Sequence, residues 1–208
     1  MLIGIYGASG FGREVMPLAK RQFGSEAEYC FIDDQGDSET RTAEPVLTWD
    51  AFREREGEKQ VALAIADAGV RKKLATRLRE SGISAVSLFD PGVLSGSDNE
   101  IGEGAIFCGF SQITSNAKIG RFFHANIYSY VAHDCVIGDF VTFAPRVCCN
   151  GNVSIGDFAY IGTGAIIRQG IAIGEGAVIG MGAVVTRDVP AGETWVGNPA
   201  AQLQRRKP

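Results

Sequence analysis

The chain contains two histidines, and one of them, His133, is followed directly by the carboxylate of Asp134. An imidazole is largely neutral near neutral pH and can take a proton from an attacking group. A carboxylate that holds the other ring nitrogen fixes the tautomer, as it does in hydrolase triads. The pair predicts proton abstraction, which acyl transfer to an amine or a hydroxyl requires.

The element that must position this pair is a repeat. Residues 101–190 divide into fifteen consecutive hexads without a slip in register. Position 1 is Ile, Val or Phe except at Ala125 and Cys149, and position 5 is small or β-branched except at Phe123. Short strands over positions 5, 6 and 1 would point positions 5 and 1 inward and position 6 outward. Glycines at positions 2 and 4 would then turn the chain.

Three such sides close one coil of eighteen residues, so the tract predicts about five coils of a parallel β-helix. In this register His133 and Asp134 occupy positions 3 and 4 of a corner, where packing does not account for them. His124 occupies position 6 and is not equivalent to His133. Two histidines are too few for a catalytic zinc, which needs about three protein ligands, and we expect no metal.

The first part of the chain has a different pattern. Apolar runs at residues 2–6, 29–32 and 61–65 predict strands, and polar, helix-compatible segments lie between and after them. Strands that alternate with helices predict a small, parallel, Rossmann-like α/β sheet. We therefore predict two domains, at residues 1–85 and 86–208.

A glycine turn after the first predicted strand presents backbone N–H groups and a helix N-terminus, which together favour a phosphate. Asp33 and Asp34 follow the second predicted strand, where acids accept hydrogen bonds from a ribose or nucleoside. The spacing is GxxGxG and not the GxGxxG of dinucleotide sites. We expect a nucleotide that is held without chemistry being done on it, and a purely structural turn is the alternative.

The order of these parts resembles the NeuD-type family of hexapeptide-repeat sugar acetyltransferases, which includes enzymes that N-acetylate nucleotide-linked 4-amino-4,6-dideoxy sugars. The resemblance covers essentially the whole chain. It is carried by IYGASGFGREV at residues 5–15, FIDD at 31–34, Asn126, AHDCVIGD at 132–139, CNGNVSIGDFAYIGTGAII at 149–167 and VGNPA at 196–200. It implies a left-handed β-helix and a homotrimer with acetyl-CoA bound between subunits.

The resemblance also implies roles for individual residues. His133 would be the general base, Asp134 its partner and Asn126 a contact near the reacting centre. The nucleotide of the sugar substrate would lie against Gly7, Ser9, Gly10, Phe11, Asp33 and Asp34. Acetyl-CoA would lie along Thr142, Gly151, Thr163, Gly180, Met181, Gly197, Pro199 and Ala200.

Two residues depart from the family pattern. Phe11 stands in the glycine turn where these enzymes often have a histidine, so a nucleotide contact through that imidazole is absent. Thr142 stands nine residues after His133, where some members have a second histidine near the acetyl group. A hydroxyl or a backbone N–H would have to stabilise the thioester carbonyl instead.

We therefore expect an acetyl-CoA-dependent N-acetyltransferase of a UDP-, GDP- or dTDP-linked amino sugar in bacterial surface glycan synthesis. O-acetylation of a sugar of the sialic-acid type is the first alternative, because the same base would serve. A non-catalytic, trimeric nucleotide-sugar-binding scaffold is the second.

Composition narrows the partners further. The formal charge of −4 and the lack of a basic stripe argue against nucleic acid. No apolar run approaches the roughly 18 residues of a membrane span, and no signal peptide precedes the first strand, so we expect a cytoplasmic protein.

Overall fold

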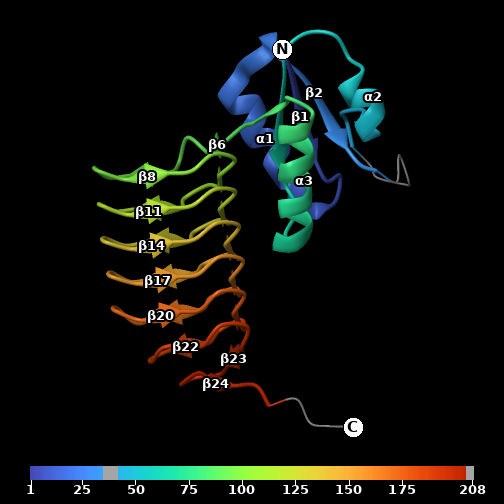
Figure 1. The fold of residues 1–208 in the computed structure, drawn as a ribbon. Helices are drawn as coiled ribbons and strands as arrows, with labels where there is room; N and C mark the ends of the chain where they lie inside the picture. Colours follow the sequence, from blue (N-terminus) through green and yellow to red (C-terminus); the bar gives the residue numbers. More distant parts are fainter. Residues whose placement is uncertain (35–41, 205–208) are drawn as a thin grey trace. The chain divides into compact units, whose positions relative to one another are not determined.

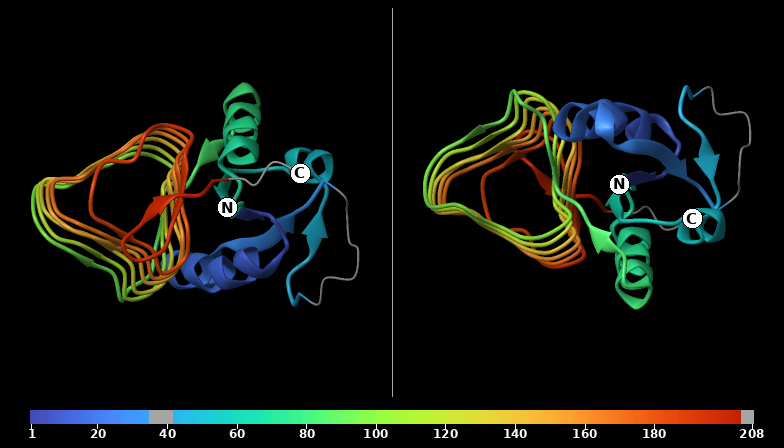
Figure 2. Two further views of the ribbon diagram at one scale, coloured as in Figure 1. Left: turned by 90° about the horizontal axis from the view of Figure 1, so that it is seen from below. Right: turned by 90° about the horizontal axis from the view of Figure 1, so that it is seen from above.

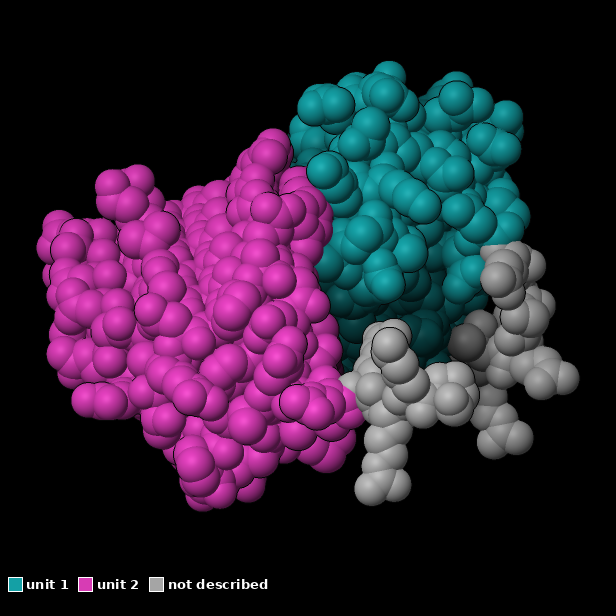
Figure 3. All heavy atoms as spheres, turned by 60° about the horizontal axis from the view of Figure 1, so that its bottom comes forward, with its two compact units in different colours: residues 1–91 teal, residues 92–208 magenta. Residues whose placement is uncertain are grey.

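The computed structural model describes residues 1–34 and 42–204. The chain divides into two compact units, residues 1–91 and 92–208 (Figure 3). The sequence prediction placed this division after residue 85. Strand β5 (Ser84–Ala85) completes the first sheet, and β6 (Leu88–Phe89) follows it and contacts helix α1, so the compact first unit extends beyond the last strand of its sheet.

Unit 1 is built on a parallel sheet with the strand order β3-β2-β1-β4-β5 (Figure 1). Strand β1 is central, and all five of its residues are buried. The strands predicted at residues 2–6, 29–32 and 61–65 are present, the last as β4 two residues earlier, with helices between and after them, whereas β3, β5 and α2 were not predicted. The elements are β1 (Leu2–Tyr6), α1 (Gly10–Phe23), the 3₁₀ turn η1 (Gly24–Glu26), β2 (Glu28–Ile32), β3 (Val46–Leu47), α2 (Trp49–Arg53), β4 (Lys59–Leu63), α3 (Ala68–Glu80) and β5.

Unit 2 is a parallel β-helix, and Figure 2 shows its triangular outline in views along the coil. Each side is one sheet, and from β7 to β22 each strand pairs with the strand 18 residues away, as Tyr130 pairs with Gln112 and Cys148. The strands cover positions 6 and 1 of the hexad, and the residues at positions 5 and 1, such as Cys135 and Ile137, are buried. The predicted repeat register is confirmed.

The three sides of the coil are named here by their strands. One sheet contains β7 (Leu94–Ser95), β10 (Gln112–Ile113), β13 (Tyr130–Val131), β16 (Cys148–Cys149), β19 (Ile166–Ile167) and β22 (Val184–Val185). The next contains β8 (Glu100–Ile101), β11 (Lys118–Ile119), β14 (Val136–Ile137), β17 (Ser154–Ile155) and β20 (Ala172–Ile173). The third contains β9 (Ile106–Phe107), β12 (His124–Ala125), β15 (Thr142–Phe143), β18 (Tyr160–Ile161), β21 (Val178–Ile179) and β23 (Thr194–Val196), with β24 (Ala201–Gln202) antiparallel to β23.

The corners differ from the predicted glycine turns in one respect. The backbone at position 4 is left-handed in every hexad from residue 98 to residue 182, whether the residue is glycine, asparagine or phenylalanine. Position 2 has no such requirement. Its glycines are needed because the neighbouring coil is close: a Cβ on Gly102 would lie 2.7 Å from the backbone nitrogen of Arg121. The turn is made at position 4, and position 2 is restricted by contact between coils.

Candidate active site

His133 and Asp134 lie at the corner between β13 and β14, and their side chains are in contact. Nδ1 of His133 is 2.7 Å from Oδ2 of Asp134, and half of the imidazole is exposed. The backbone of Asp134 is left-handed, with a φ of +60°. Because the carboxylate can only accept, Nδ1 carries the proton and Nε2 is the basic nitrogen. The side-chain contact expected from the sequence is therefore present.

Asp134 has a second partner that the sequence analysis missed. Nδ2 of Asn116 donates a hydrogen bond of 2.6 Å to Oδ1 of Asp134. This bond, followed by the bond with His133, lowers the pKa of Asp134 below its ordinary value. The signal was the period of the coil, because Asn116 lies 18 residues before Asp134 and so occupies the same corner position one coil earlier.

Gly151 lies at the same corner one coil after His133, with its backbone against the imidazole. We call the corner formed by residues 132–135 and their equivalents in the other coils the His133 corner. Of the residues expected to bind acetyl-CoA, Gly151 is the one that the structure places at this corner.

Most of the other residues expected to bind acetyl-CoA lie at a different corner. Asn126 follows β12, and its amide donates to the carbonyl of Phe143 in the next coil at 2.9 Å. We call the corner formed by residues 126–129 and their equivalents the Asn126 corner. Thr163 and Met181 are exposed there, Met181 to 81%, and Gly180 lies beside them. Gly197 and Pro199 extend this column as exposed residues, whereas Ala200 is buried and donates its N–H to Val184.

The structure does not bring Asn126 and His133 together within one chain. The side of the coil that contains β13 separates their two corners. One hexad joins the corners, and six extended residues span up to about 20 Å. The expected contact of both residues with one reacting group is therefore not formed by a single copy of the chain.

Thr142 is at neither corner. It lies in β15 and is 4% exposed, so the structure does not offer its hydroxyl to a ligand. His124, its neighbour in the sheet, is also fully buried, although position 6 was expected to face outward. The direct contact of Thr142 with acetyl-CoA that was expected from the family pattern does not fit this burial.

In unit 1 the residues expected to bind the nucleotide lie at one edge of the sheet. Gly7 and Ser9 lie between β1 and α1, Gly10 and Phe11 are the first two residues of α1, and Asp33 and Asp34 follow the parallel neighbour β2. Ser9 is the N-cap of α1, yet its side chain makes no capping bond. A Cβ on Gly12 would lie 1.8 Å from the carbonyl oxygen of Gly7, so close packing explains Gly12. No atom lies within 4 Å of a Cβ on Gly10, and packing does not explain that glycine.

Asp34 is already engaged by side chains that sequence reasoning missed. Nη1 of Arg77, from α3, is 2.8 Å from Oδ2 of Asp34, and the hydroxyl of Tyr6 donates to Oδ1 at 2.9 Å. Burial and the adjacent Asp34 raise the pKa of Tyr6 well above its ordinary value. The guanidinium of Arg77 also lies 5.7 Å from the centre of the Trp49 ring. A nucleotide would meet Asp34 with its carboxylate oriented by Arg77 and Tyr6.

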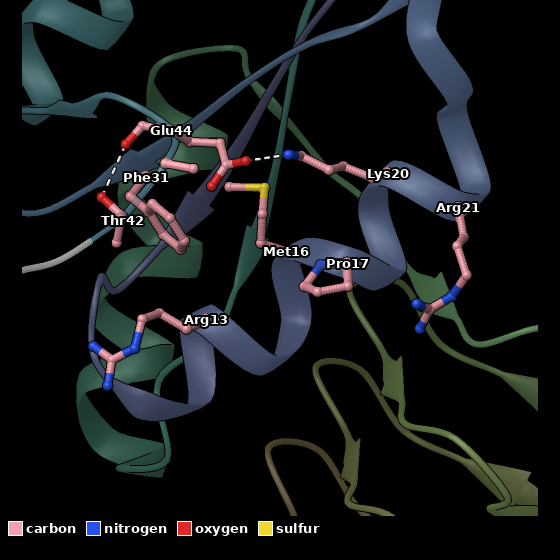
Figure 4. Close-up of a pocket in the computed structure, with 9 residues that line it drawn as sticks. Arg13, Met16, Pro17, Lys20, Arg21, Phe31, Thr42 and Glu44 are labelled. Carbon is pink, nitrogen blue, oxygen red and sulfur yellow. Dashed lines mark hydrogen bonds and ion pairs between the residues drawn. The ribbon is translucent and has the colours of Figure 1, made fainter.

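A separate cavity of about 400 Å³ lies along α1 (Figure 4). Arg13, Met16, Pro17 and Lys20 line it from the helix, and Lys20 forms an ion pair with Glu44 across it. None of the six residues expected to contact the nucleotide lines this cavity. It is therefore not the predicted nucleotide site.

Two further features concern the described residues as a whole. No three His, Cys, Asp or Glu side chains within 1–34 and 42–204 are grouped closely enough to hold a metal ion. Over the same ranges, no helix combines the length and apolar character that a membrane span needs.

Comparison with protein families matches each unit separately. Residues 2–78 match the PglD N-terminal domain, and residues 152–187 match the bacterial transferase hexapeptide model of six repeats. GDP-perosamine N-acetyltransferase of Escherichia coli O157:H7 is 44% identical over 159 residues, which cover 74% of this chain and 72% of that protein.

Solved structures match nearly the whole chain. WeeI from Acinetobacter baumannii AYE is 51% identical, with a TM-score of 0.94 over 98% of this chain and 100% of that one. PerB from Caulobacter crescentus, in complex with CoA and GDP-perosamine, is 26% identical, with a TM-score of 0.90 over 98% of each chain. The coil of unit 2 is accordingly the left-handed β-helix of hexapeptide-repeat transferases.

Proposed function

This chain belongs to the hexapeptide-repeat sugar N-acetyltransferase family, and from that premise we propose that it acetylates the amino group of a nucleotide-linked amino sugar in bacterial glycan synthesis. Acetyl-CoA is the acetyl donor, and a GDP-linked sugar of the GDP-perosamine type is the acceptor. The observation that carries the proposal is the exposed His133–Asp134 pair in a chain 44% identical to a GDP-perosamine N-acetyltransferase.

His133 is the general base of the proposed reaction. Nε2 of His133 takes a proton as the sugar amine attacks the thioester carbonyl carbon, and the new C–N bond replaces the C–S bond. Nδ1 stays hydrogen bonded to Asp134, whose negative charge stabilises the imidazolium. The proton then passes to the CoA sulfur, so that the products are the acetamide and the free thiol.

The Asn126 corner is the proposed binding surface for acetyl-CoA. Exposed groups at Thr163, Met181 and Gly197 form a column that runs along several coils and suits an extended pantetheine chain. Gly151 belongs instead to the surroundings of His133. Thr142 is left out of the proposed site because its side chain is buried.

A homotrimer would join the two corners. The base lies on the His133 corner and most of the proposed acetyl-CoA surface lies on the Asn126 corner, so one copy carries two incomplete halves. In a cyclic oligomer of three or more subunits each interface is heterologous, so that one surface of a subunit meets a different surface of the next. A trimer of this kind would place the His133 corner of one subunit beside the Asn126 corner of its neighbour, three times.

The nucleotide is proposed to bind at the carboxyl edge of the sheet in unit 1. Gly7, Ser9, Gly10 and Phe11 would approach the diphosphate, where the N-terminus of α1 presents backbone N–H groups. Asp33 and Asp34 would accept hydrogen bonds from the nucleoside. No atom of the chain occupies the space beside Gly10, and this open space supports the placement of a ligand there.

The decisive experiment is turnover of GDP-perosamine and acetyl-CoA by the whole chain, followed by mass spectrometry. His133→Ala should lower kcat/KM by about 10²–10⁴, the usual value of a positioned base. A matched control is Gln169→Ala, an exposed side chain at the equivalent corner position two coils further on. A kcat/KM for His133→Ala within a few-fold of the wild type would overturn the role of His133.

The same experiment distinguishes the alternatives. A product acetylated on a hydroxyl would favour the sugar O-acetyltransferase. Binding of the nucleotide sugar without turnover would favour the scaffold. In that case CoA should also fail to raise the melting temperature, because a ligand stabilises a folded protein that it binds.

A further inference from the structure

The carboxylate of Asp134 is held at both of its oxygens. Oδ2 faces Nδ1 of His133 at 2.7 Å, and Oδ1 accepts from Nδ2 of Asn116 at 2.6 Å. We propose that Asn116 is a positioning residue for the proposed acetyl transfer: its amide fixes the carboxylate of Asp134, which in turn fixes the ring orientation and the tautomer of His133.

The backbone makes this arrangement rigid. Asn116 and Asp134 both occupy position 4 of the hexad, with left-handed φ values of 54° and 60°. Asn116 N–H donates to Ser97, Asp134 N–H donates to Ser115, and Asn152 N–H donates to His133, each across one coil. The two side chains therefore project from equivalent points of adjacent coils, and their separation is set by the strand spacing of about 4.8 Å.

An amide donor suits this place better than a charged one. An exposed carboxylate with one partner could rotate about its last side-chain bond, and its second oxygen would be solvated. Asn116 removes that freedom without adding a positive charge that would compete with imidazolium formation on His133. The hydrogen bond is charge-assisted, which is the stronger class of hydrogen bond. In support, the bond from Asn116 is the largest cause of the lowered pKa of Asp134.

Glycine variants test the proposal without strain. Five hexads of this chain already have glycine in the left-handed position, among them Gly164 and Gly170. Asn116→Gly therefore removes the amide and keeps the turn. Asn152→Gly is the matched control: it lies one coil beyond Asp134, with a φ of 57°, and its contact with the dyad is made by its backbone N–H.

Asn116→Gly should lower kcat about 10-fold, as expected for a lost hydrogen bond to a charged group, with the KM of both substrates unchanged. Asn152→Gly should keep kcat within two-fold. In the background of Asp134→Gly, which also keeps the left-handed turn, Asn116→Gly should have no further effect on kcat, because its partner is already gone. Equal losses in the two glycine variants, or an additive effect in the double variant, would overturn the proposal.

A second measurement does not need turnover. The chain has two histidines, so ¹⁵N-labelled imidazoles give two sets of ring signals, and His133→Ala assigns them. In the wild type His133 should be in the Nδ1–H form, and Asn116→Gly should mix in the Nε2–H form while Asn152→Gly should not. The proposal rests on the proposed function, yet an unchanged tautomer would refute the positioning role alone, and an inactive wild type would refute the acetyl transfer alone.

Discussion

The imidazole of His133 lies against the backbone of Gly151, one coil further along the chain. A Cβ added to Gly151 would be 2.4 Å from Cε1 and 2.5 Å from Nε2 of that ring. The φ of Gly151 is not left-handed, so the turn does not require glycine there. Glycine is needed there because a larger residue would collide with Nε2 of His133, the proposed base.

Gly151→Ala should therefore displace the His133 ring and lower kcat/KM by about 10²-fold or more, because small misplacements of a catalytic group are costly. Stability should change little, since half of the imidazole is exposed and the ring can move into solvent. Steady-state kinetics and urea unfolding measure the two effects. If Gly151→Ala had the kinetics of the wild type, or lost activity only because it unfolds, the steric contact between Gly151 and His133 would not matter for catalysis.

Gly10→Ala separates ligand binding from packing in unit 1. No atom of the chain lies near the added Cβ, and alanine is favoured over glycine in a helix, so stability should be equal or higher. The KM of the nucleotide sugar should rise about 10-fold, equivalent to losing one hydrogen bond to a charged group, and the KM of acetyl-CoA should stay the same. Gly69→Ala, in the first turn of α3, is the control and should leave both KM values unchanged.

Asp139 gives the coil a pH-dependent contact. Burial alone would raise the pKa of Asp139, but hydrogen bonds and charge from Arg121 outweigh it and lower the pKa below its ordinary 3.8. Stability from this pair is therefore complete above about pH 4 and is lost as the pH falls through the lowered pKa. Asp139→Asn should cost about 1–2 kcal/mol at pH 7 and less at pH 3 in urea unfolding. Arg121→Gln should remove the same pH-dependent part, and equal costs at both pH values would contradict the assignment.

Phe140 is the middle ring of a stack at another corner. Its centre lies 5.2 Å from that of Phe122 and 5.4 Å from that of Phe158, with the planes nearly parallel. Phe140→Ala should cost about 3 kcal/mol or more in the free energy of unfolding. Phe140→Gly loses the same ring but relieves the left-handed backbone, so it should cost about 1 kcal/mol less than the alanine variant. Phe110→Ala, at a ring 61% exposed, is the control and should cost clearly less.

The repeat could be predicted from sequence because its signal is local and periodic. Position 1 is apolar in every hexad and position 5 in all but the two that have Ser111 and Ser129, and the burial of Cys135, Val131 and Ile137 follows from that rule. The short elements β3 and α2 could not be predicted in the same way. Strand β3 has two residues and α2 has five, which is too few for either periodicity to emerge.

The site was predicted in part. The pairing of His133 with Asp134 follows from their adjacency at a corner. The contact of Asn116 with Asp134 could be predicted only by noting that the two residues lie one coil, or 18 residues, apart. The burial of Thr142 and His124 could not be predicted, because the repeat gives the direction of a side chain and not what covers it. Asn126 was expected to contact the region near the reacting centre, and the register of the coil places it at a different corner from His133.

The register of the coil also has a metric consequence. Every coil of eighteen residues adds one strand spacing, about 4.8 Å, along the axis of the β-helix. Gly151, Gln169 and Arg187 lie one, two and three coils beyond His133, towards the end at which Gly197 lies. Inserting a whole coil would lengthen the proposed acetyl-CoA surface by one strand spacing and keep every corner aligned. Inserting six residues would instead move each later residue to a different corner.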